Sequence, residues 1–282
     1  LSRGLGDVYK RQNLRMSEMI SCPLRIGVAL RPETENLLAC FLHVYISKIV
    51  RRFRMLSDQT IQHVKLSSWA DFAQAADQLE GWVFRGQPNE DWPLVSSLTR
   101  HLARYCPDTT LWPLREERAI RVFRRKAHVY LQDGSVLEDD LRCLALMQHH
   151  GAPTRLVDFT KSPFVAAFFA LWHLQGDAAV FALNTPALWK AAPRFDPSLH
   201  RDVIDLRKPG NYQRYFANNN HGLVWFGEPN QMDARLVAQS GILVVPGMLD
   251  VPLETLLAGY DSDEPLLRKF ILPAQVLSLI HI

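Results

Sequence analysis

An arginine, a glycine and a glutamine follow one another at the end of an apolar stretch near position 85. The segment "GWVFRGQ" begins with β-favouring residues and ends with Arg85, Gly86 and Gln87. An arginine in this position presents a rigid fork of donors to a phosphate or a carboxylate. Gly86 allows the backbone to turn or a ligand to approach closely. The alternative is a salt bridge within the fold, for example between Arg85 and Asp158.

The densest set of polar residues lies in "MQHHGAPTRLVDFTKSP", residues 147–163. The candidate binding or catalytic residues in this segment are His149, His150, Thr154, Arg155, Asp158, Thr160 and Ser162. Beside an aromatic helix these groups need partners, because an unpaired buried polar group costs roughly 1–3 kcal/mol. They line a site in which Asp158 is the acidic group and His150 handles a proton near neutral pH, or Arg155 and Asp158 form a buried pair that fixes the loop. No spacing here predicts a metal site.

A third set comes directly before a predicted buried strand, in "RLVAQSGILVVP", residues 235–246. Gln239 and Ser240 could reach a cleft at the mouth of that strand. The alternative is an ordinary junction in which Gly241 supplies backbone freedom. The preceding segment "YFANNNHGLVWFGEPNQMDAR" is interpreted as a loop with aromatic residues, serving as a lid or as a cluster of turns.

Helices are expected mainly in the first half of the chain and strands in the second. Helices are predicted within residues 67–79, 114–131, 136–151 and 161–174, and strands at 63–66, 82–86, 178–184, 241–246 and 269–276. The helix in 161–174 is expected to be deeply packed, since Phe164, Ala167, Phe168, Leu171 and Trp172 give it a broad apolar face. The predicted fold is α+β, a single domain with a central mixed or antiparallel sheet and a helix-rich N-terminal half. No βαβ alternation or glycine-rich nucleotide loop is present.

The charge distribution gives no basic surface for nucleic acid. The formal charge is +3, but residues 1–54 hold 10 Lys and Arg against 4 Asp and Glu, which leaves 22 against 25 in residues 55–282. The four cysteines form no CxxC pair, which favours free thiols in a reducing cytoplasm. The run "NLLACFLHVYISKIV" is too short, and too interrupted by His43 and Lys48, to cross a membrane. We therefore expect a cytoplasmic protein without a membrane partner.

Both ends of the sequence are expected to be foreign to the protein. "DVYKRQ" at residues 7–12 and "LSLIHI" at 277–282 can be read from opposite strands of one DNA sequence, which resembles a transposon end used to prepare sequencing libraries. Residues 1–12 and 277–282 are therefore predicted to be adaptor-derived. Residues 13–54 are an upstream extension or read-through, and residues 55–276 are a domain truncated at its C-terminus, with Met55 a better start than Met16 or Met19.

Four motifs together resemble the FRG domain, a family named after a Phe/Tyr-Arg-Gly motif. They are "WVFRGQ", "SSLTR" at 96–100, "QHHGAPTRLVDFTKSPFVAAFFAL" and "RLVAQSGILVVP", and the resemblance extends over roughly residues 63–276. Members of the family are mostly bacterial and phage-associated. The family resemblance implies a fold and no particular reaction.

The order of these motifs is also similar to the layout of ADP-ribosyltransferases. That resemblance implies that Arg85 holds a phosphate or ribose of NAD, that Thr160 and Ser162 shape the nicotinamide pocket, and that Gln239 stands in the catalytic motif. Gly241 occupies the position where the layout has a catalytic glutamate, and a neutral Gln239 cannot stabilise a developing cation. Either Asp158 or a carboxylate beyond Val276 is expected to substitute for that glutamate.

Two functions follow from these resemblances. The first is an NAD-like nucleotide cleft in an ADP-ribosyltransferase or NAD glycohydrolase of a toxin or phage-defence system, with NAD as substrate and no metal. In it Arg85, Gly86, Gln87, His149, Thr154, Arg155, Thr160, Ser162 and Ser240 bind the ligand, while Asp158, His150 and Gln239 are catalytic. The second is a non-enzymatic module that binds a ligand or a protein, in which the same polar residues are recognition or structural groups. The sequence leaves any macromolecular target undetermined.

Overall fold

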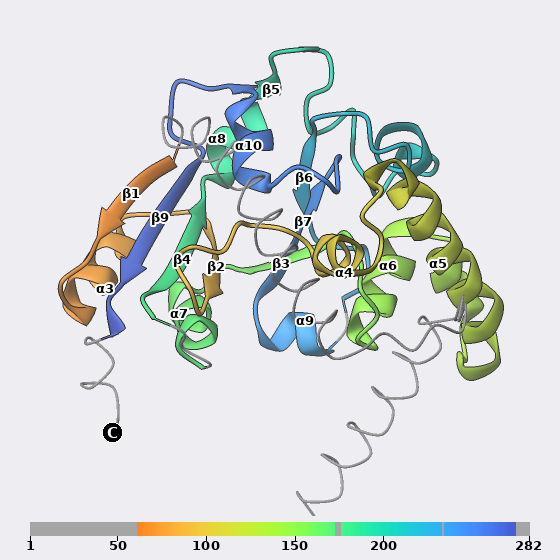
Figure 1. The fold of residues 1–282 in the computed structure, drawn as a ribbon, viewed down its shortest axis with the longest axis horizontal. Coiled ribbons are helices and arrows are strands. Elements are labelled where there is room, and N and C mark those ends of the chain that lie inside the picture. The colour runs from red at the N-terminus through yellow and green to blue at the C-terminus, as the bar shows by residue number, and fades with distance from the viewer. Residues whose placement is uncertain (1–60, 173–175, 233, 275–282) are drawn as a thin grey trace, which may run out of the picture.

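The computed structural model describes residues 61–172, 176–232 and 234–274. The expected adaptor segments, the 13–54 extension and the candidate start at Met55 lie outside these residues. Within them, the predicted α+β architecture is confirmed: a mixed sheet forms the centre, and helices pack on both of its faces (Figure 1).

The central sheet has seven strands in the order β1-β9-β4-β2-β3-β7-β6. Their bounds are β1 Ile61–Lys65, β2 Val83–Gln87, β3 Val157–Thr160, β4 Ala178–Leu183, β6 Val224–Gly227, β7 Gly241–Pro246 and β9 Leu267–Leu272. The β1–β9 pair is parallel and the other neighbours are antiparallel. A separate two-stranded sheet joins β5 (Ala192–Pro193) to β8 (Tyr260–Asp261).

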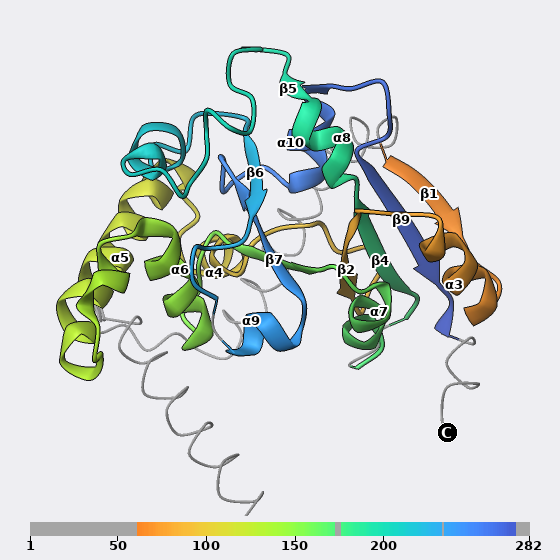
Figure 2. The same cartoon turned by 180° about the vertical axis from the view of Figure 1, so that it is seen from behind.

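Helices lie over both faces of the sheet and at its two ends. Their bounds are α3 Trp69–Asp77, α4 Ser97–Tyr105, α5 Trp112–Ala127, α6 Asp140–His149, α7 Pro163–Leu171, α8 Thr185–Lys190, α9 Ala234–Ala238 and α10 Leu253–Ala258. Short 3₁₀ turns at Thr109–Leu111, His128–Tyr130 and Gly134–Leu137, and a π-helical turn at Tyr212–Phe216, complete the set. Figure 2 shows α5 and α6 at the β6 end and α3 at the β1 end.

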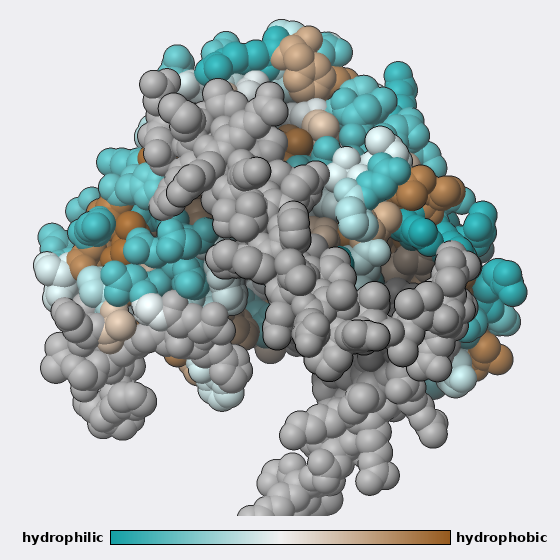
Figure 3. Space-filling model, viewed as in Figure 1, coloured by the Kyte–Doolittle hydropathy of each residue, from teal (hydrophilic) through white to brown (hydrophobic). Residues whose placement is uncertain are grey.

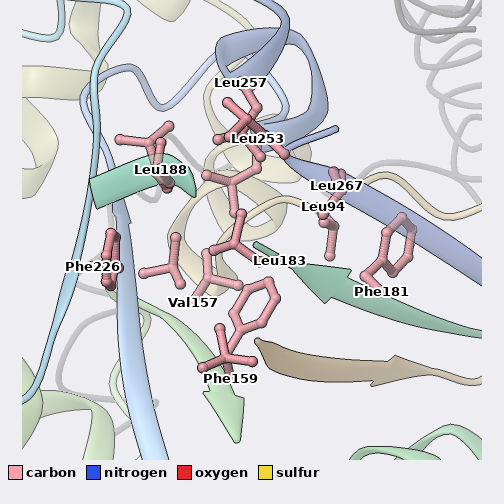
Figure 4. Packing of buried hydrophobic residues seen from close by; sticks show 14 of the residues in the cluster. Leu94, Val157, Phe159, Phe181, Leu183, Leu188, Phe226, Leu253, Leu257 and Leu267 are labelled. Carbon is pink, nitrogen blue, oxygen red and sulfur yellow. The ribbon is translucent and has the colours of Figure 1, made fainter. Parts of the chain in front are cut away.

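Successive side chains of each strand point to opposite faces of the sheet, where they join different hydrophobic clusters. Phe181 and Leu183 of β4 point to one face of the sheet, where they pack with Leu188 of α8 and Leu253 of α10 (Figure 4). Val83 of β2 belongs to the same cluster. On the other face, one cluster gathers under α3 and α7 and another under α5, α6 and the π-helical turn. The strands of the middle of the sheet are therefore buried on both sides.

Two predictions differ from the structure, one in the type of element and one in its burial. The aromatic segment around Trp225 was predicted as a loop, but it forms β6, whose four residues are all buried at the sheet edge. Helix α7 lies within the predicted range 161–174, with Ser162 as its N-cap and Pro163 in its first turn. Its expected deep packing is wrong, because Phe164, Phe168 and Trp172 are 53%, 51% and 62% exposed.

Small residues carry the packing of α7 instead. Ala166, Ala167 and Ala170 are buried against the sheet, which brings the helix backbone very close to β2. A Cβ atom built on Gly86 would lie 1.9 Å from the carbonyl oxygen of Ala166 and 2.6 Å from the amide nitrogen of Ala170. Gly86 thus serves the contact between helix and sheet.

A buried carboxyl group holds the loop that follows β2. Glu254 is 7% exposed; its Oε1 accepts a hydrogen bond of 2.7 Å from the Leu94 amide, and its Oε2 has no partner among the described residues. Gln87 donates to the Pro93 carbonyl at 3.3 Å, and its own buried Oε1 also lacks a described partner. Burial raises the pKa of Glu254, with the Leu94 hydrogen bond opposing the shift.

This burial predicts a stability that depends on pH. Because the pKa of Glu254 is higher in the folded than in the unfolded state, its protonated form favours folding. The free energy of unfolding should therefore fall as pH rises from about 4.3, the ordinary glutamate value, through the raised pKa. Glu254→Gln should remove this component and stabilise the protein by about 1 kcal/mol at pH 8, in urea unfolding at several pH values. An unchanged pH profile in the variant would contradict the prediction.

No helix in the described part of the chain is long and apolar enough to cross a membrane. On the face drawn in Figure 3, hydrophilic residues predominate in the described part, with a hydrophobic patch over the β1 and α3 end.

Candidate functional site

The side chain of Arg85 fills an opening in the sheet between β2 and β3. Strand β2 pairs with β4 along all five of its residues, whereas it meets β3 only at Phe84 and Thr160. Beyond that point Arg85 Nη1 donates a hydrogen bond of 2.6 Å to the backbone carbonyl of Asp158. The backbone carbonyl of β3 is thus satisfied by a guanidinium in place of a neighbouring strand.

The guanidinium of Arg85 keeps unused hydrogen-bonding capacity. Its Nε is buried without a partner, and no carboxylate of the described residues lies within ion-pair distance of it. Burial, partly offset by Asp158 and reinforced by the charge of Arg100, lowers the pKa of Arg85 to about 10. Arg85 is still a cation at pH 7, and the nearby Arg100 belongs to α4, where its Nη1 donates to the Val95 carbonyl at 2.9 Å.

The carboxylate of Asp158 is oriented by Gln148. Gln148 Nε2 donates a hydrogen bond of 2.6 Å to Asp158 Oδ1, while Gln148 Oε1 accepts one from the hydroxyl of buried Thr154. Thr154 is fixed in turn by Ser97 at the start of α4, whose hydroxyl oxygen accepts from the Thr154 amide at 3.1 Å. Asp158, Gln148 and Thr154 therefore form a chain that connects β3, α6 and the loop between them.

A small hollow opens beside Asp158, between α6, β3, β7 and the segment before β7. It has a volume of about 20 Å³, and its polar lining consists of Gln148, His149, Asp158 and Gln239. A space of this size admits on the order of one water molecule. Three of the predicted site residues, His149, Asp158 and Gln239, are thus brought together here, with Arg85 bonded to the backbone of the same aspartate.

The guanidinium of Arg155 is fully engaged by partners inside the domain. It is completely buried, and its guanidinium makes a two-pronged ion pair with Glu116 of α5, with Arg155 Nε 2.8 Å from Glu116 Oε1. A further hydrogen bond of 3.1 Å goes to the Pro246 carbonyl, and the ring of Tyr212 packs against the same group. The expected Arg155–Asp158 pair is wrong, because each residue has another partner. Thr154 and Arg155 are buried at 1% and 0% exposure, so the proposed site does not include them.

Thr160 and Ser162 join β3 to the segment before β7 and to α7. Thr160 Oγ1 donates to the Gln239 carbonyl at 2.6 Å and accepts from the Ser162 amide at 3.0 Å, while Ser162 caps α7 through the Val165 amide. These bonds position the backbone of Gln239 at the hollow. Both hydroxyls therefore act as supports.

The remaining predicted residues lie outside the hollow. His150 is exposed at the end of α6, with its ring edge-on to that of His149. Ser240 is exposed and has a positive φ of 47°, and its carbonyl accepts from the Lys161 amide. The expectation that Gly241 supplies backbone freedom is wrong, because its φ is not positive; a Cβ there would lie 2.5 Å from Leu236 Cδ1 and 3.1 Å from the Leu236 carbonyl oxygen, so the glycine serves close packing.

Two residues were missed by reasoning from the sequence, Gln148 and Glu116. Gln148 lies in the polar segment 147–163, next to His149, and both residues line the hollow; its place in that segment was the available signal. Glu116 lies 39 positions from Arg155 in a helix rich in charged residues, and only the packing of α5 distinguishes it from its neighbours.

The fold therefore defines an α+β domain with a mixed sheet, opened between β2 and β3. Residues 80–177 match the FRG domain family, a range that contains Arg85, Gly86, Arg100, Gln148 and Asp158. The match is shorter than the resemblance over residues 63–276 and leaves Gln239 outside. No curated protein and no solved structure is significantly similar to the chain.

Proposed function

We propose that this domain recognises an anionic ligand of the nucleotide-phosphate type at Arg85. The observation that carries the proposal is the guanidinium of Arg85, which is half-buried, charged and without a carboxylate partner among the described residues. A guanidinium held in this way is suited to a phosphate or carboxylate, which gives short, charge-assisted hydrogen bonds. The proximity of Arg100 adds a second positive charge, and an anion would relieve the repulsion between the two groups.

The small volume of the hollow favours a binding module over an enclosed active site. Pockets that surround a drug-sized molecule measure about 300–1,000 Å³. The hollow of about 20 Å³ beside Gln148, Asp158 and Gln239 is too small to enclose such a molecule, and Arg85 does not line it, so a ligand at Arg85 would lie outside the hollow. His149 completes this polar lining.

Cleavage of NAD, by ADP-ribosyl transfer or hydrolysis, is the second candidate function. The observation that favours it is the carboxylate of Asp158, which lines the hollow and is oriented by Gln148. A fixed negative charge is what an oxocarbenium-like transition state requires, and Gln239 cannot supply it. Such an activity would suit a toxin or a phage-defence protein.

Replacing Arg85 tests the binding proposal. Arg85→Ala should weaken the binding of ADP and of pyrophosphate about tenfold to a hundredfold, since a charged hydrogen bond contributes about 1.5–3 kcal/mol. Calorimetric titration of the full chain checks this result, with adenosine as the ligand without phosphate. Arg121→Ala is the matched control, because Arg121 is an exposed arginine of α5 paired with Glu117.

Three outcomes separate the candidates. Weaker binding by a folded Arg85→Ala variant, with no effect of Arg121→Ala, supports anion recognition. Equal binding by wild type and Arg85→Ala rejects it, and so does an Arg85→Lys variant that fails to fold, because the side chain would then be structural. Release of nicotinamide from NAD by wild type, abolished by Asp158→Asn, supports the enzymatic candidate.

A further inference from the structure

A larger pocket lies away from Arg85, between α3, the start of β2 and the start of α7. Its volume is about 570 Å³, within the range of about 300–1,000 Å³ that accommodates small molecules. Helices α3 and α7 lie near each other here (Figures 1 and 2). The ring centroids of Trp69 on α3 and Phe164 on α7 are 5.9 Å apart. The pocket is separate from the Arg85 site, because Arg85 does not line it and it shares no lining residue with the hollow beside Asp158.

The walls of this pocket are apolar and aromatic. Three aromatic rings line the pocket, those of Trp82, Phe84 and Phe164. On the α3 side the lining residues Ala73 and Ala76 have short side chains. Short side chains on α3 are what leave the space open, since a longer residue at Ala73 would extend into it. The walls therefore fit the flat apolar body of a small ligand.

The charge at the pocket is negative. Asp77 and Lys161 are its charged lining residues, and Lys161 is already paired with Glu228 at 2.6 Å. Asp77 has no hydrogen-bond or ion-pair partner among the described residues. It is also the last residue of α3, whose final turn has no basic side chain, so the negative end of the helix dipole adds to its charge.

One cation lies nearby without lining the pocket. The guanidinium of Arg268 packs over the ring of Trp82, 4.9 Å from its centre. It makes no ion pair with Asp77, and Arg268 is not among the lining residues of the pocket. Asp77 therefore remains the charge available to a ligand.

We propose that this pocket binds a small apolar molecule that carries an ammonium group. The aromatic and alanine walls would hold the apolar body, and the ammonium would face Asp77 at the C-terminal end of α3. A carboxylate in the same position would be repelled by Asp77 and by the helix dipole.

Three probes of one shape test the charge preference. They are 1-naphthylmethylamine, 1-methylnaphthalene and 1-naphthoic acid, titrated into the full chain by ligand-observed NMR. We expect the amine to bind most tightly and the acid most weakly. Asp77→Asn should weaken the amine about threefold to fivefold and leave the neutral probe unchanged, the size of effect that one exposed charge produces.

Filling the pocket tests its location. Ala73→Leu should weaken all three probes by at least about tenfold, because the added carbons occupy the ligand volume. Ala70→Leu is the matched control, since Ala70 is an exposed residue of the same helix and does not line the pocket. The proposal is overturned if no probe saturates, if the acid binds as well as the amine, or if both leucine variants have the same effect.

Discussion

Gly86→Ala is expected to destabilise the domain by at least about 3 kcal/mol, the upper range for overpacking a core. The new Cβ would lie 1.9 Å from the Ala166 carbonyl oxygen and 2.6 Å from the Ala170 amide, both of them backbone atoms of α7. A side chain could rotate away from such a contact, but a helix backbone can only move as a whole. Relief therefore requires α7 to lift from β2 and expose the alanines beneath it.

Urea unfolding followed by circular dichroism measures this effect. Gly134→Ala is the matched control, since a Cβ at Gly134 would have no atom within 4 Å and the backbone there has no positive φ. The control should change the free energy of unfolding by less than about 1 kcal/mol. If Gly86→Ala were as stable as the control, α7 would not approach β2 as closely as described.

Glu116→Ala is expected to cost about 3–5 kcal/mol, because it leaves the charge of Arg155 buried without a partner. The guanidinium of Arg155 is completely buried, and after the change only the Pro246 carbonyl and the ring of Tyr212 would remain around it. Burial of Glu116 and its two-pronged pairing make this the ion pair in the described residues whose loss should matter most. Equilibrium unfolding of the variant gives the loss directly.

The neighbouring glutamate provides the control for this second prediction. Glu117 pairs with Arg121 on the exposed side of α5, with side-chain exposures of 60% and 63%, so Glu117→Ala should cost at most about 1 kcal/mol. The double variant Glu116→Met with Arg155→Met should be more stable than Glu116→Ala, since it removes both charges and keeps the volume. Equal losses for Glu116→Ala and Glu117→Ala would show that Arg155 does not depend on this pair.

The fold followed from the sequence where patterns were local. Helices were predicted within residues 67–79 and 161–174, and in the structure Ser68 and Ser162 accept hydrogen bonds from the first turns of α3 and α7 in these ranges. The apolar runs at Ala178–Leu183 and Gly241–Pro246 form buried strands, as expected. Capping and continuous apolar runs depend on neighbours in the chain, so one segment carries the whole signal.

Which side of a helix packs against the sheet could not be predicted from local patterns. The aromatic residues of α7 had the spacing of a buried face, yet the structure buries the alanines and exposes Phe164, Phe168 and Trp172. Helical periodicity identifies faces but not which of two apolar faces meets the sheet. Gly86 decides between them, because only small residues on α7 can pack against a glycine of β2.

For the candidate site, the sequence by itself determined the types of group that are present: an arginine after a β-favouring run, a histidine and an aspartate around a short strand, and a glutamine before a buried strand. The tertiary structure decided which of them meet. It places Asp158, His149 and Gln239 around one hollow, with Arg85 on the Asp158 carbonyl, and it assigns Arg155 to Glu116. The physical reason is that an arginine in a sequence has the same chemistry wherever it stands. Its role depends on the partner that folding brings to it, and that partner lies 73 residues from Arg85 and 39 from Arg155.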